Sequence, residues 1–259
     1  MHDSETLTRY GEIELSVVVP VFNERQSIEI ILKRIQDVDV DKEIVIVDDR
    51  STDGTRELLE ELERAQRSPT VSVFKLPSTG TEIRIDNLHI IFQSSNQGKG
   101  AALQRGFRAA RGNVVVIQDA DLEYDPQDYL KLLAPIRAGA ADVVIGSRFL
   151  GGPHSVLSFW HYMANRFLTT LSNVCTNLSL TDMETCYKMF RREILDSIEI
   201  RQKRFGCEPE IIAKVANLGY RFYEVPISYH GRGRDEGKKI TWKDGLKAVW
   251  AIVKYSVWK

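Results

Sequence analysis

The sequence has no long apolar run and few cysteines. No segment approaches the roughly 18 consecutive apolar residues that predict a membrane-spanning helix, and residues 1–11 lack the apolar core of a signal peptide. The three cysteines, Cys175, Cys186 and Cys207, are an odd count without metal-ligand spacing, which argues against a disulfide scaffold or a zinc site. These absences predict a cytoplasmic protein with reduced thiols.

Two common nucleotide-binding motifs are also missing. No Gly-x-Gly-x-x-Gly follows the first expected strand, which argues against a dinucleotide-binding fold. Gly98-Lys99 resembles part of a P-loop, but the earlier glycine is absent and Gly100 stands where a P-loop has Ser or Thr. A P-loop NTPase is therefore not expected.

What the chain does contain is a regular alternation of short apolar strands and amphipathic helices. Strands are expected at 15–20, 43–47, 88–92, 114–118, 143–147 and 222–225, with helices between the earlier ones and at 155–176 and 241–258. With 259 residues, 43% of them apolar, the chain suits one α/β domain. The alternation predicts a mostly parallel twisted sheet flanked by helices.

Charge is spread unevenly along the chain. The formal net charge is −1, yet residues 201–259 hold 13 Lys and Arg against 6 Asp and Glu. A basic stretch of this kind predicts an anionic partner, either phosphate groups or a lipid surface, and a solvated basic face is the alternative. Nothing indicates nucleic acid as a partner, and the oligomeric state is not indicated.

Acidic and polar residues follow three of the expected strands. They are Asn23-Glu24, Asp48-Asp49 and the pair Asp119 and Asp121. Ligands of open α/β sheets bind at the carboxyl ends of strands. Two carboxylates at spacing two, if the backbone stays extended, point to one side and suit Mg²⁺ or Mn²⁺. An isolated Asp-x-Asp is a weak signal, since many are solvated turns, and its place after a buried strand strengthens it.

Five motifs in order carry a family resemblance. They are Val19-Pro20-Val21-Phe22-Asn23-Glu24, Val47-Asp48-Asp49 with 51–55, Asn96-Gln97-Gly98-Lys99-Gly100, Asp119-Ala120-Asp121-Leu122-Glu123 and Gly146-Ser147-Arg148. This pattern resembles the family-2 inverting glycosyltransferases of the GT-A fold, closest to the dolichyl-phosphate and polyprenyl-phosphate sugar transferases. The resemblance implies one domain, 1–259. Residues 12–150 would bind a nucleotide sugar, and 151–259 would form helices and a basic loop on the acceptor side.

The resemblance also implies roles for individual residues on the donor side. Asp119, Asp121 and Glu123 would hold a divalent cation, Mg²⁺ or Mn²⁺, against the donor diphosphate. Glu123 stands where the family branch often has Gln. Asp49 would accept a hydrogen bond from a base N–H. The other residues expected to bind the nucleotide sugar are Pro20, Phe22, Asn23, Glu24, Val47, Lys99 and Ala120.

Basic residues are the expected phosphate ligands. Arg148 would contact phosphate, since a guanidinium fork suits phosphate oxygens, and Arg166 is a second candidate. A Gly-rich basic loop resembles the mobile loop that closes over the donor in this family, and its candidate residues are Arg232, Arg234 and Lys238. Closure of such a loop would exclude water.

Two acceptors remain open. A lipid phosphate is already anionic, whereas a saccharide hydroxyl needs a general base, for which the candidates are Asp182, Glu184, Glu208 and Glu210.

The expected C-terminal helix carries an apolar stripe with lysines between its members. The stripe consists of Trp242, Leu246, Val249, Trp250, Val253 and Val257. That stripe can lie in a membrane interface, at the cytoplasmic face, or pack on the sheet. A nucleotide-binding protein without turnover is a third hypothesis, which the complete motifs disfavour.

Overall fold

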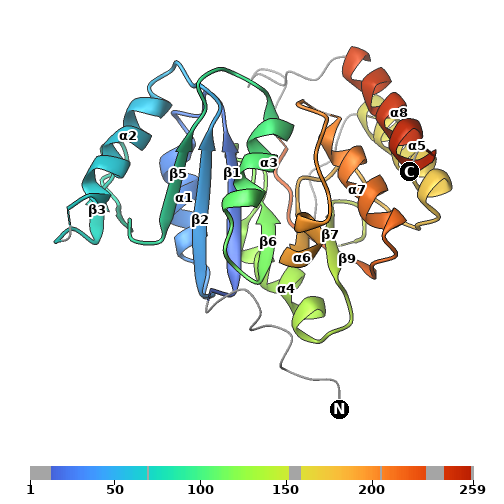
Figure 1. The fold of residues 1–259 in the computed structure, drawn as a ribbon, viewed down its shortest axis with the longest axis horizontal. Helices are drawn as coiled ribbons and strands as arrows, with labels where there is room; N and C mark the ends of the chain where they lie inside the picture. Colours follow the sequence, from blue (N-terminus) through green and yellow to red (C-terminus); the bar gives the residue numbers. More distant parts are fainter. Residues whose placement is uncertain (1–12, 69, 152–158, 205, 232–241, 258–259) are drawn as a thin grey trace.

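The computed structural model describes residues 13–68, 70–151, 159–204, 206–231 and 242–257. Its main sheet has seven strands in the order β5-β2-β1-β6-β8-β7-β9 (Figure 1). The strands are β1 (Leu15–Val21), β2 (Lys42–Asp48), β5 (Leu88–Phe92), β6 (Val114–Ile117), β7 (Val143–Ser147), β8 (Lys188–Arg191) and β9 (Phe222–Pro226). Every strand expected from the sequence is present, within a few residues of its predicted ends.

The sheet is mostly parallel, as predicted. β1 pairs in parallel with β2 and β6, β2 with β5, and β7 with β9. The exception is β8, which runs antiparallel between β6 and β7. β8 is a four-residue segment that the sequence pattern did not predict, because half of its residues are basic. β8 lies between β6 and β7 and β9 lies at the edge beside β7, so strands from the second half of the chain belong to the same sheet.

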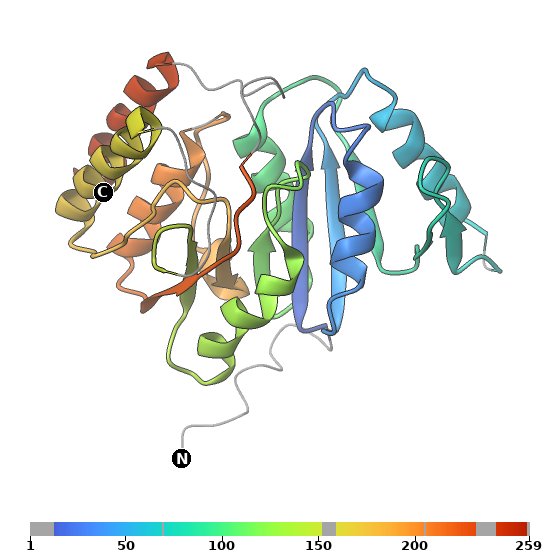
Figure 2. The same cartoon turned by 180° about the vertical axis from the view of Figure 1, so that it is seen from behind.

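Helices cover both faces of the sheet. They are α1 (Ile28–Gln36), α2 (Thr55–Gln66), α3 (Lys99–Ala109), η2 (Pro126–Asp128), α4 (Tyr129–Arg137), α5 (Phe159–Thr176), α6 (Arg192–Asp196), α7 (Cys207–Asn217) and α8 (Trp242–Val257). A small hairpin, β3 (Val73–Lys75) with β4 (Glu82–Arg84), lies at the edge. Figures 1 and 2 show α3 on one face of the sheet and α1 on the other, with α5, α7 and α8 gathered beyond β7.

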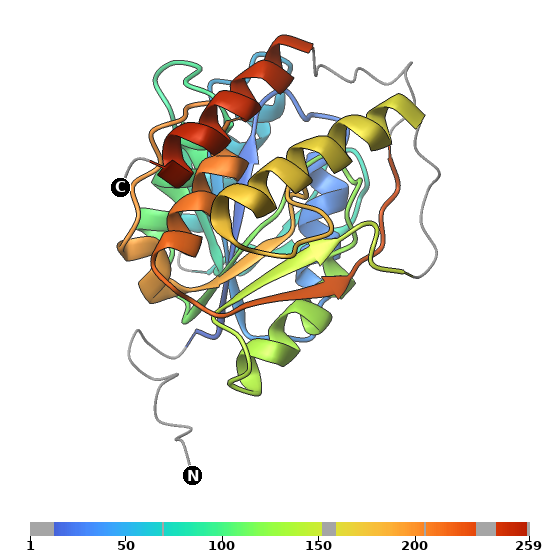
Figure 3. The same cartoon turned by 90° about the vertical axis from the view of Figure 1, so that its right-hand side faces the viewer.

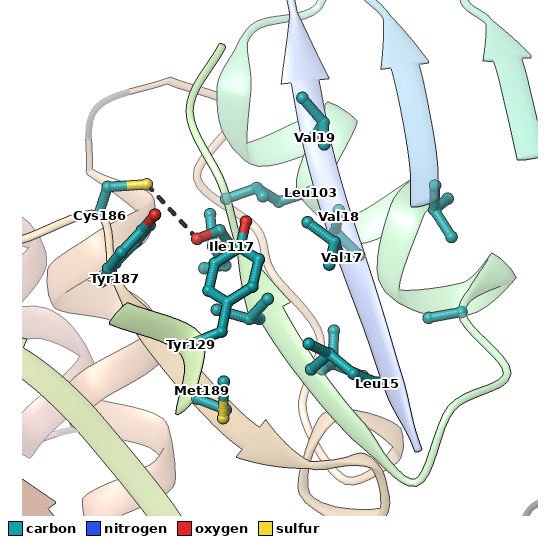
Figure 4. Close-up of a cluster of buried hydrophobic side chains, with 14 of the residues drawn as sticks. Leu15, Val17, Val18, Val19, Leu103, Ile117, Tyr129, Cys186, Tyr187 and Met189 are labelled. Atoms are coloured by element: carbon teal, nitrogen blue, oxygen red, sulfur yellow. Dashed lines mark hydrogen bonds between the residues drawn. The ribbon is translucent and has the colours of Figure 1, made fainter. Parts of the chain in front are cut away.

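The core is continuous along the central strands. β1 contains four valines, and all of its residues except Pro20 are buried, as expected for a strand covered on both faces. Figure 4 shows its valines and Leu103 of α3 beside Ile117, Tyr129 and Met189. A Cβ on Gly106 of α3 would come within 2.4 Å of Val18, so α3 can pack this closely only because glycine stands there.

The three cysteines are free, as predicted. Cys186 is buried, and its thiol donates to the carbonyl oxygen of Ile117 at 3.8 Å (Figure 4). No helix among the described residues is both long enough and apolar enough to cross a bilayer.

Candidate active site

A cavity of about 850 Å³ lies at the carboxyl edge of the sheet. It is lined by residues 23–27, Asp53, Asp121, Leu122, His230 and Gly231. These segments follow β1, β2, β6 and β9, so strand ends that are far apart in sequence meet in one place. The position agrees with the rule that open α/β sheets bind ligands at the carboxyl ends of their strands.

Hydrogen bonds between two loops build one wall of this cavity. Asn23 has a positive φ of 57°, its backbone N–H donates to Ser51 Oγ at 3.0 Å, and its Oδ1 accepts from the Thr52 N–H at 2.8 Å. The Glu24 carboxylate accepts from Ser27 Oγ at 2.7 Å. Phe22, directly before this loop, is 39% exposed, and Pro20 is half-buried. The expected nucleoside-side residues Pro20, Phe22, Asn23 and Glu24 therefore follow one another at the end of β1.

Asp49 and Val47 lie deeper than a ligand-contacting role suggests. Asp49 is only 3% exposed, and its two oxygens accept from Gln93 Nε2 and from the backbone N–H groups of Gln97 and Gly98 at 2.7–2.9 Å. Burial raises the pKa of Asp49, although these two backbone donors oppose the shift. Val47 has no exposed surface. The structure thus uses Asp49 to hold the loop before α3, and contact of either residue with a nucleotide stays a prediction.

The Asp119-Ala120-Asp121 segment turns instead of staying extended. β6 ends at Ile117, residues 120–121 form a turn, and Leu122 has a φ of 65°. Asp121 lines the cavity, and its Oδ1 accepts from the Glu123 N–H at 3.1 Å. Ala120 is buried. The condition under which both carboxylates would point to one side, an extended backbone, is therefore not met here, and the turn gives the two carboxylates different neighbours.

Asp119 is engaged by a lysine. Lys99 Nζ lies 2.8 Å from Asp119 Oδ1 and 2.9 Å from Glu208 Oε1, so one ammonium group bridges two carboxylates. Burial alone would lower the pKa of Lys99, but Asp119 and Glu208 outweigh it and raise that pKa well above its usual value. The ion triad links the end of β6 to α7.

Two glycines put Lys99 in this position. A Cβ on Gly98 would come within 2.2 Å of the carbonyl oxygen of Lys203, and one on Gly100 within 1.9 Å of that of Gln202. The Gly100 N–H donates to the Lys203 oxygen at 3.0 Å. The two glycines of the Gly-Lys-Gly motif therefore allow the backbone to pack closely against Gln202 and Lys203. This packing places the Lys99 ammonium between Asp119 and Glu208.

The donor set fits a hard divalent cation. Mg²⁺ is usually held by one or two carboxylates together with substrate phosphates and water. Asp121 supplies such oxygens in the lining of the cavity, and Asp119 lies two residues before it. His230 lines the same cavity and offers an imidazole nitrogen. Glu123, the third expected ligand, accepts a hydrogen bond from the Tyr229 hydroxyl at 2.9 Å. Among the described residues, no three His, Cys, Asp or Glu side chains are already grouped for a metal.

Arg148 and Asp182 form a buried bidentate pair. Arg148 Nε and Nη2 donate to the two oxygens of Asp182 at 2.6 and 2.8 Å, and its backbone N–H donates to Oδ2 at 3.1 Å. Asp182 has no exposed surface and also accepts from Asn165 Nδ2 at 3.2 Å. A carboxylate saturated in this way is poorly placed to take a substrate proton, and its geometry suits it to orient the guanidinium.

Tyr229 connects this pair to the cavity. The centroid of its ring lies 5.1 Å from the Arg148 guanidinium carbon, and its hydroxyl donates a hydrogen bond to the Glu123 carboxylate. Burial, followed by the neighbouring Glu123 carboxylate, raises the pKa of the Tyr229 hydroxyl. The next residue, His230, lines the cavity. From the sequence, Tyr229 and His230 are only the first residues of the basic loop and have no predicted role of their own, although their position just after the last parallel strand was the available signal.

Glu184 is a further carboxylate with a strongly shifted pKa. Burial raises its pKa to about 7, Glu208 adds to the shift, and the cations of Lys188 and Arg148 oppose it. Its Oε1 is buried and has no hydrogen-bond partner among the described residues. By contrast, Lys99 and Lys188 outweigh burial and lower the pKa of Glu208 to about 2. The two glutamates therefore differ in protonation at neutral pH.

Replacing Glu184 with glutamine is expected to flatten the pH dependence of stability. The folded-state pKa of about 7 lies above the ordinary value of 4.5, so the folded protein binds the extra proton between these values. The free energy of unfolding should then fall as pH rises from 4.5 to 7, by on the order of 1–3 kcal/mol. Urea unfolding at several pH values measures this. Glu61→Gln, at an exposed position on α2, is the control, and equal pH slopes for wild type and Glu184→Gln would contradict the assignment.

The remaining predicted residues are placed as follows. Arg166 is exposed on α5, one residue after the Asn165 that bonds Asp182. Glu210 is buried and accepts from the Arg201 and Gln202 N–H groups at 2.8 and 2.6 Å, so it holds that segment. Arg232, Arg234 and Lys238 lie outside the described residues.

The sequence of this chain is similar to a family model and to several known proteins. The family model described as Glycosyl transferase family 2 matches residues 16–199. A polyprenol monophosphomannose synthase of Mycolicibacterium smegmatis is 29% identical over 225 residues, 83% of this chain and 77% of that protein. An undecaprenyl-phosphate mannosyltransferase of Micrococcus luteus is 29% identical over 232 residues, 85% of each chain. A dolichol-phosphate mannosyltransferase of Pyrococcus furiosus is 28% identical, with 87% of this chain and 59% of that protein covered.

Solved structures give the same fold at lower identity. A glucosyl-3-phosphoglycerate synthase from Mycobacterium tuberculosis, in complex with Mn²⁺, UDP and phosphoglyceric acid, superposes with a TM-score of 0.67 at 19% identity. That match covers 95% of this chain and 79% of the other. The same enzyme with Mg²⁺ and UDP gives a TM-score of 0.65 at 20% identity, over 95% and 80% of the two chains.

Proposed function

The chain belongs to glycosyl transferase family 2, and we propose that this glycosyltransferase moves a sugar from a nucleotide-sugar donor to a polyprenyl phosphate. Family membership follows from the match over residues 16–199 and confirms the resemblance seen in the motifs. The likeness to solved structures confirms the GT-A fold. The observation that carries the proposal is the cavity where the loop after β1, Asp121 and His230 meet.

In the proposed reaction the donor occupies this cavity. The loop at Phe22, Asn23 and Glu24 binds the nucleoside, and Asp49 keeps the neighbouring loop in position. The diphosphate lies toward Asp121 and Asp119. Asp121 and Asp119 would hold a Mg²⁺ or Mn²⁺ ion, which would supply positive charge to the leaving diphosphate, as the Mn²⁺ and Mg²⁺ complexes of the structural relative support.

The acceptor side is arranged for an anion. A phosphate oxygen is already a nucleophile and needs no proton removed, so its main requirement is cations that place it opposite the leaving group. Arg148, oriented by Asp182, would meet this requirement, and Arg166 of α5 together with Arg232, Arg234 and Lys238 of the basic loop would add to it. The names of the three curated relatives support a polyprenyl phosphate as the acceptor.

A hydroxyl acceptor is the second candidate, and one observation favours it. Glu184 combines a pKa of about 7 with an unpartnered buried oxygen, which are properties of a general base. If the acceptor is a saccharide or another hydroxyl compound, we expect Glu184, rather than the saturated Asp182, to take the proton.

A donor and acceptor screen tests the proposal. Thermal shift with GDP- and UDP-sugars, each with Mg²⁺ or Mn²⁺, should show one donor that raises the melting temperature by mass action. That donor is then offered a short-chain prenyl phosphate and a set of saccharides, and the product is identified by mass spectrometry. Transfer to the prenyl phosphate supports the proposal, whereas transfer only to a hydroxyl supports the second candidate.

A further inference from the structure

The β3–β4 hairpin interrupts the alternation of strands and helices between α2 and β5. Its two strands form a small sheet of their own. Leu76 and Ile83 of the hairpin are buried in the main core. The Arg84 backbone N–H donates to Gln36 Oε1 at the end of α1, at 2.8 Å. The hairpin is therefore anchored on the sheet domain and on α1.

Glu29 of α1 joins the turn of this hairpin to the cavity. Its Oε2 accepts from the backbone N–H groups of Ser78 and Thr79 at 3.0 and 2.9 Å, and its Oε1 accepts from Arg25 Nη1 at 2.8 Å. The residue is only 1% exposed. Burial by itself raises the pKa of Glu29, but the hydrogen bonds from Thr79, Ser78 and Arg25 outweigh it and lower that pKa. A charged carboxylate thus connects the hairpin to Arg25 at neutral pH.

Arg25 carries this connection into the cavity wall. It is one of the residues that line the cavity. Its Nη2 donates to Ser78 Oγ at 3.0 Å, and its backbone N–H donates to Asp53 Oδ2 at 3.0 Å. The backbone of Arg25 is therefore held by the loop after β2, and its guanidinium is held by α1 and the hairpin.

The loop that Arg25 ends is conformationally costly. Asn23 has a φ of 57°, and a residue in this region keeps its conformation only where the surrounding contacts enforce it. Hydrogen bonds to Ser51 and Thr52 hold Asn23 from the loop after β2. The contacts of Arg25 hold the same loop from the opposite end, two residues further along the chain.

We propose that Arg25 is a positioning residue of the donor site, and that the β3–β4 hairpin fixes it through Glu29 and Ser78. The inference rests on the proposed function, in which residues 22–24 bind the nucleoside. Without this tie, the loop samples other conformations and must be ordered when the nucleotide binds, which weakens binding. An interaction of this kind acts on donor affinity and leaves the chemical step unchanged, so KM for the donor should rise while kcat stays the same.

The proposed acceptor side lies away from the hairpin. Arg148 follows β7, which is separated from β5 by four strands of the sheet. Helices α5 and α8 lie at the end of the molecule opposite the hairpin, and that end faces the viewer in Figure 3. Leu246, Trp250 and Val253 of α8 are 44–60% exposed there, so these members of the predicted apolar stripe do not pack on the sheet. Changes at the hairpin tie should therefore leave KM for the acceptor unchanged.

Nucleotide binding by two variants tests the inference. In Glu29→Gln one carboxylate oxygen becomes an amide NH₂, which cannot accept a hydrogen bond, and Arg25→Gln removes the guanidinium. The dissociation constants of UDP and GDP, each with Mg²⁺, are measured by titration calorimetry. For the nucleotide that wild type binds more tightly, each variant should bind about 5–20-fold more weakly. Arg25→Lys, whose ammonium can still reach Glu29, should recover part of the affinity.

Hydrogen exchange without nucleotide gives an independent readout. Amides of residues 22–27 should exchange faster in both variants, whereas those of β6 should exchange as in wild type. The matched control is Arg67→Gln, which removes an exposed pair with Glu63 at the end of α2 and should change neither nucleotide binding nor exchange.

Ser78→Ala keeps the test decisive if Glu29→Gln does not fold. It removes the Oγ that accepts from Arg25 and keeps the backbone N–H that donates to Glu29, so it should weaken nucleotide binding in the same direction by a smaller factor. Variants that have a lower melting temperature but bind nucleotide like wild type, or unchanged exchange of residues 22–27, would overturn the inference alone. If wild type binds neither nucleotide, the proposed function is refuted and the inference with it.

Discussion

Asp121→Asn should reduce sugar transfer by roughly 10²–10⁴-fold while the protein stays folded. The asparagine Oδ1 can still accept from the Glu123 N–H, so the turn is kept. What is lost is the negative charge that would hold a divalent cation beside the leaving diphosphate. Initial rates at saturating donor and acceptor measure the effect, and the melting temperature checks the fold.

Two comparisons make the result specific. Asp125→Asn changes a nearby carboxylate that caps η2 and does not line the cavity, and it should leave the rate within a few-fold of wild type. Asp119→Asn should likewise reduce transfer strongly, with an added loss of stability because Lys99 loses one of its two carboxylates. A chelator-resistant wild-type activity would falsify the metal role of this segment.

Arg148→Ala should damage both stability and acceptor use. Removing one partner of a buried ion pair leaves a charge without compensation and costs about 3–5 kcal/mol, and Asp182 has no exposed surface. Loss of a charge-assisted contact to the acceptor phosphate should lower kcat/KM for the prenyl phosphate by roughly 10–150-fold. Urea unfolding and steady-state kinetics with the acceptor varied measure the two effects.

The chain contains a matched control for this pair. Arg221 binds Asp142 with the same fork, at 2.9 and 2.8 Å, but its side chain is 56% exposed. Arg221→Ala should therefore lower the free energy of unfolding far less than Arg148→Ala does, and it should leave turnover intact. Arg148→Ala combined with Asp182→Asn should recover stability, since the buried charge is gone, without recovering activity. If the double variant regains activity, Arg148 acts only as a structural residue.

Much of the candidate site could be predicted from the sequence because its signals are local. An apolar β-branched run makes a buried strand, and a polar residue directly after a parallel strand must lie at the carboxyl edge of the sheet. Those two rules placed Asn23, Glu24 and Asp121 around one site, and the cavity contains all three. The same rules did not predict β8, because a four-residue segment with two basic residues shows little periodicity.

The sequence by itself determined the parallel α/β architecture, the family and the strand ends that carry the site. Only the tertiary structure decided what those side chains do. It tied Asp119 to Lys99 and Glu208, saturated Asp182 with Arg148, and turned the aromatic sides of α5 and α8 outward. The physical reason is that each of these outcomes depends on a partner from a distant part of the chain. Local periodicity shows that a helix has an apolar side, whereas which side is covered depends on the neighbours that the fold provides.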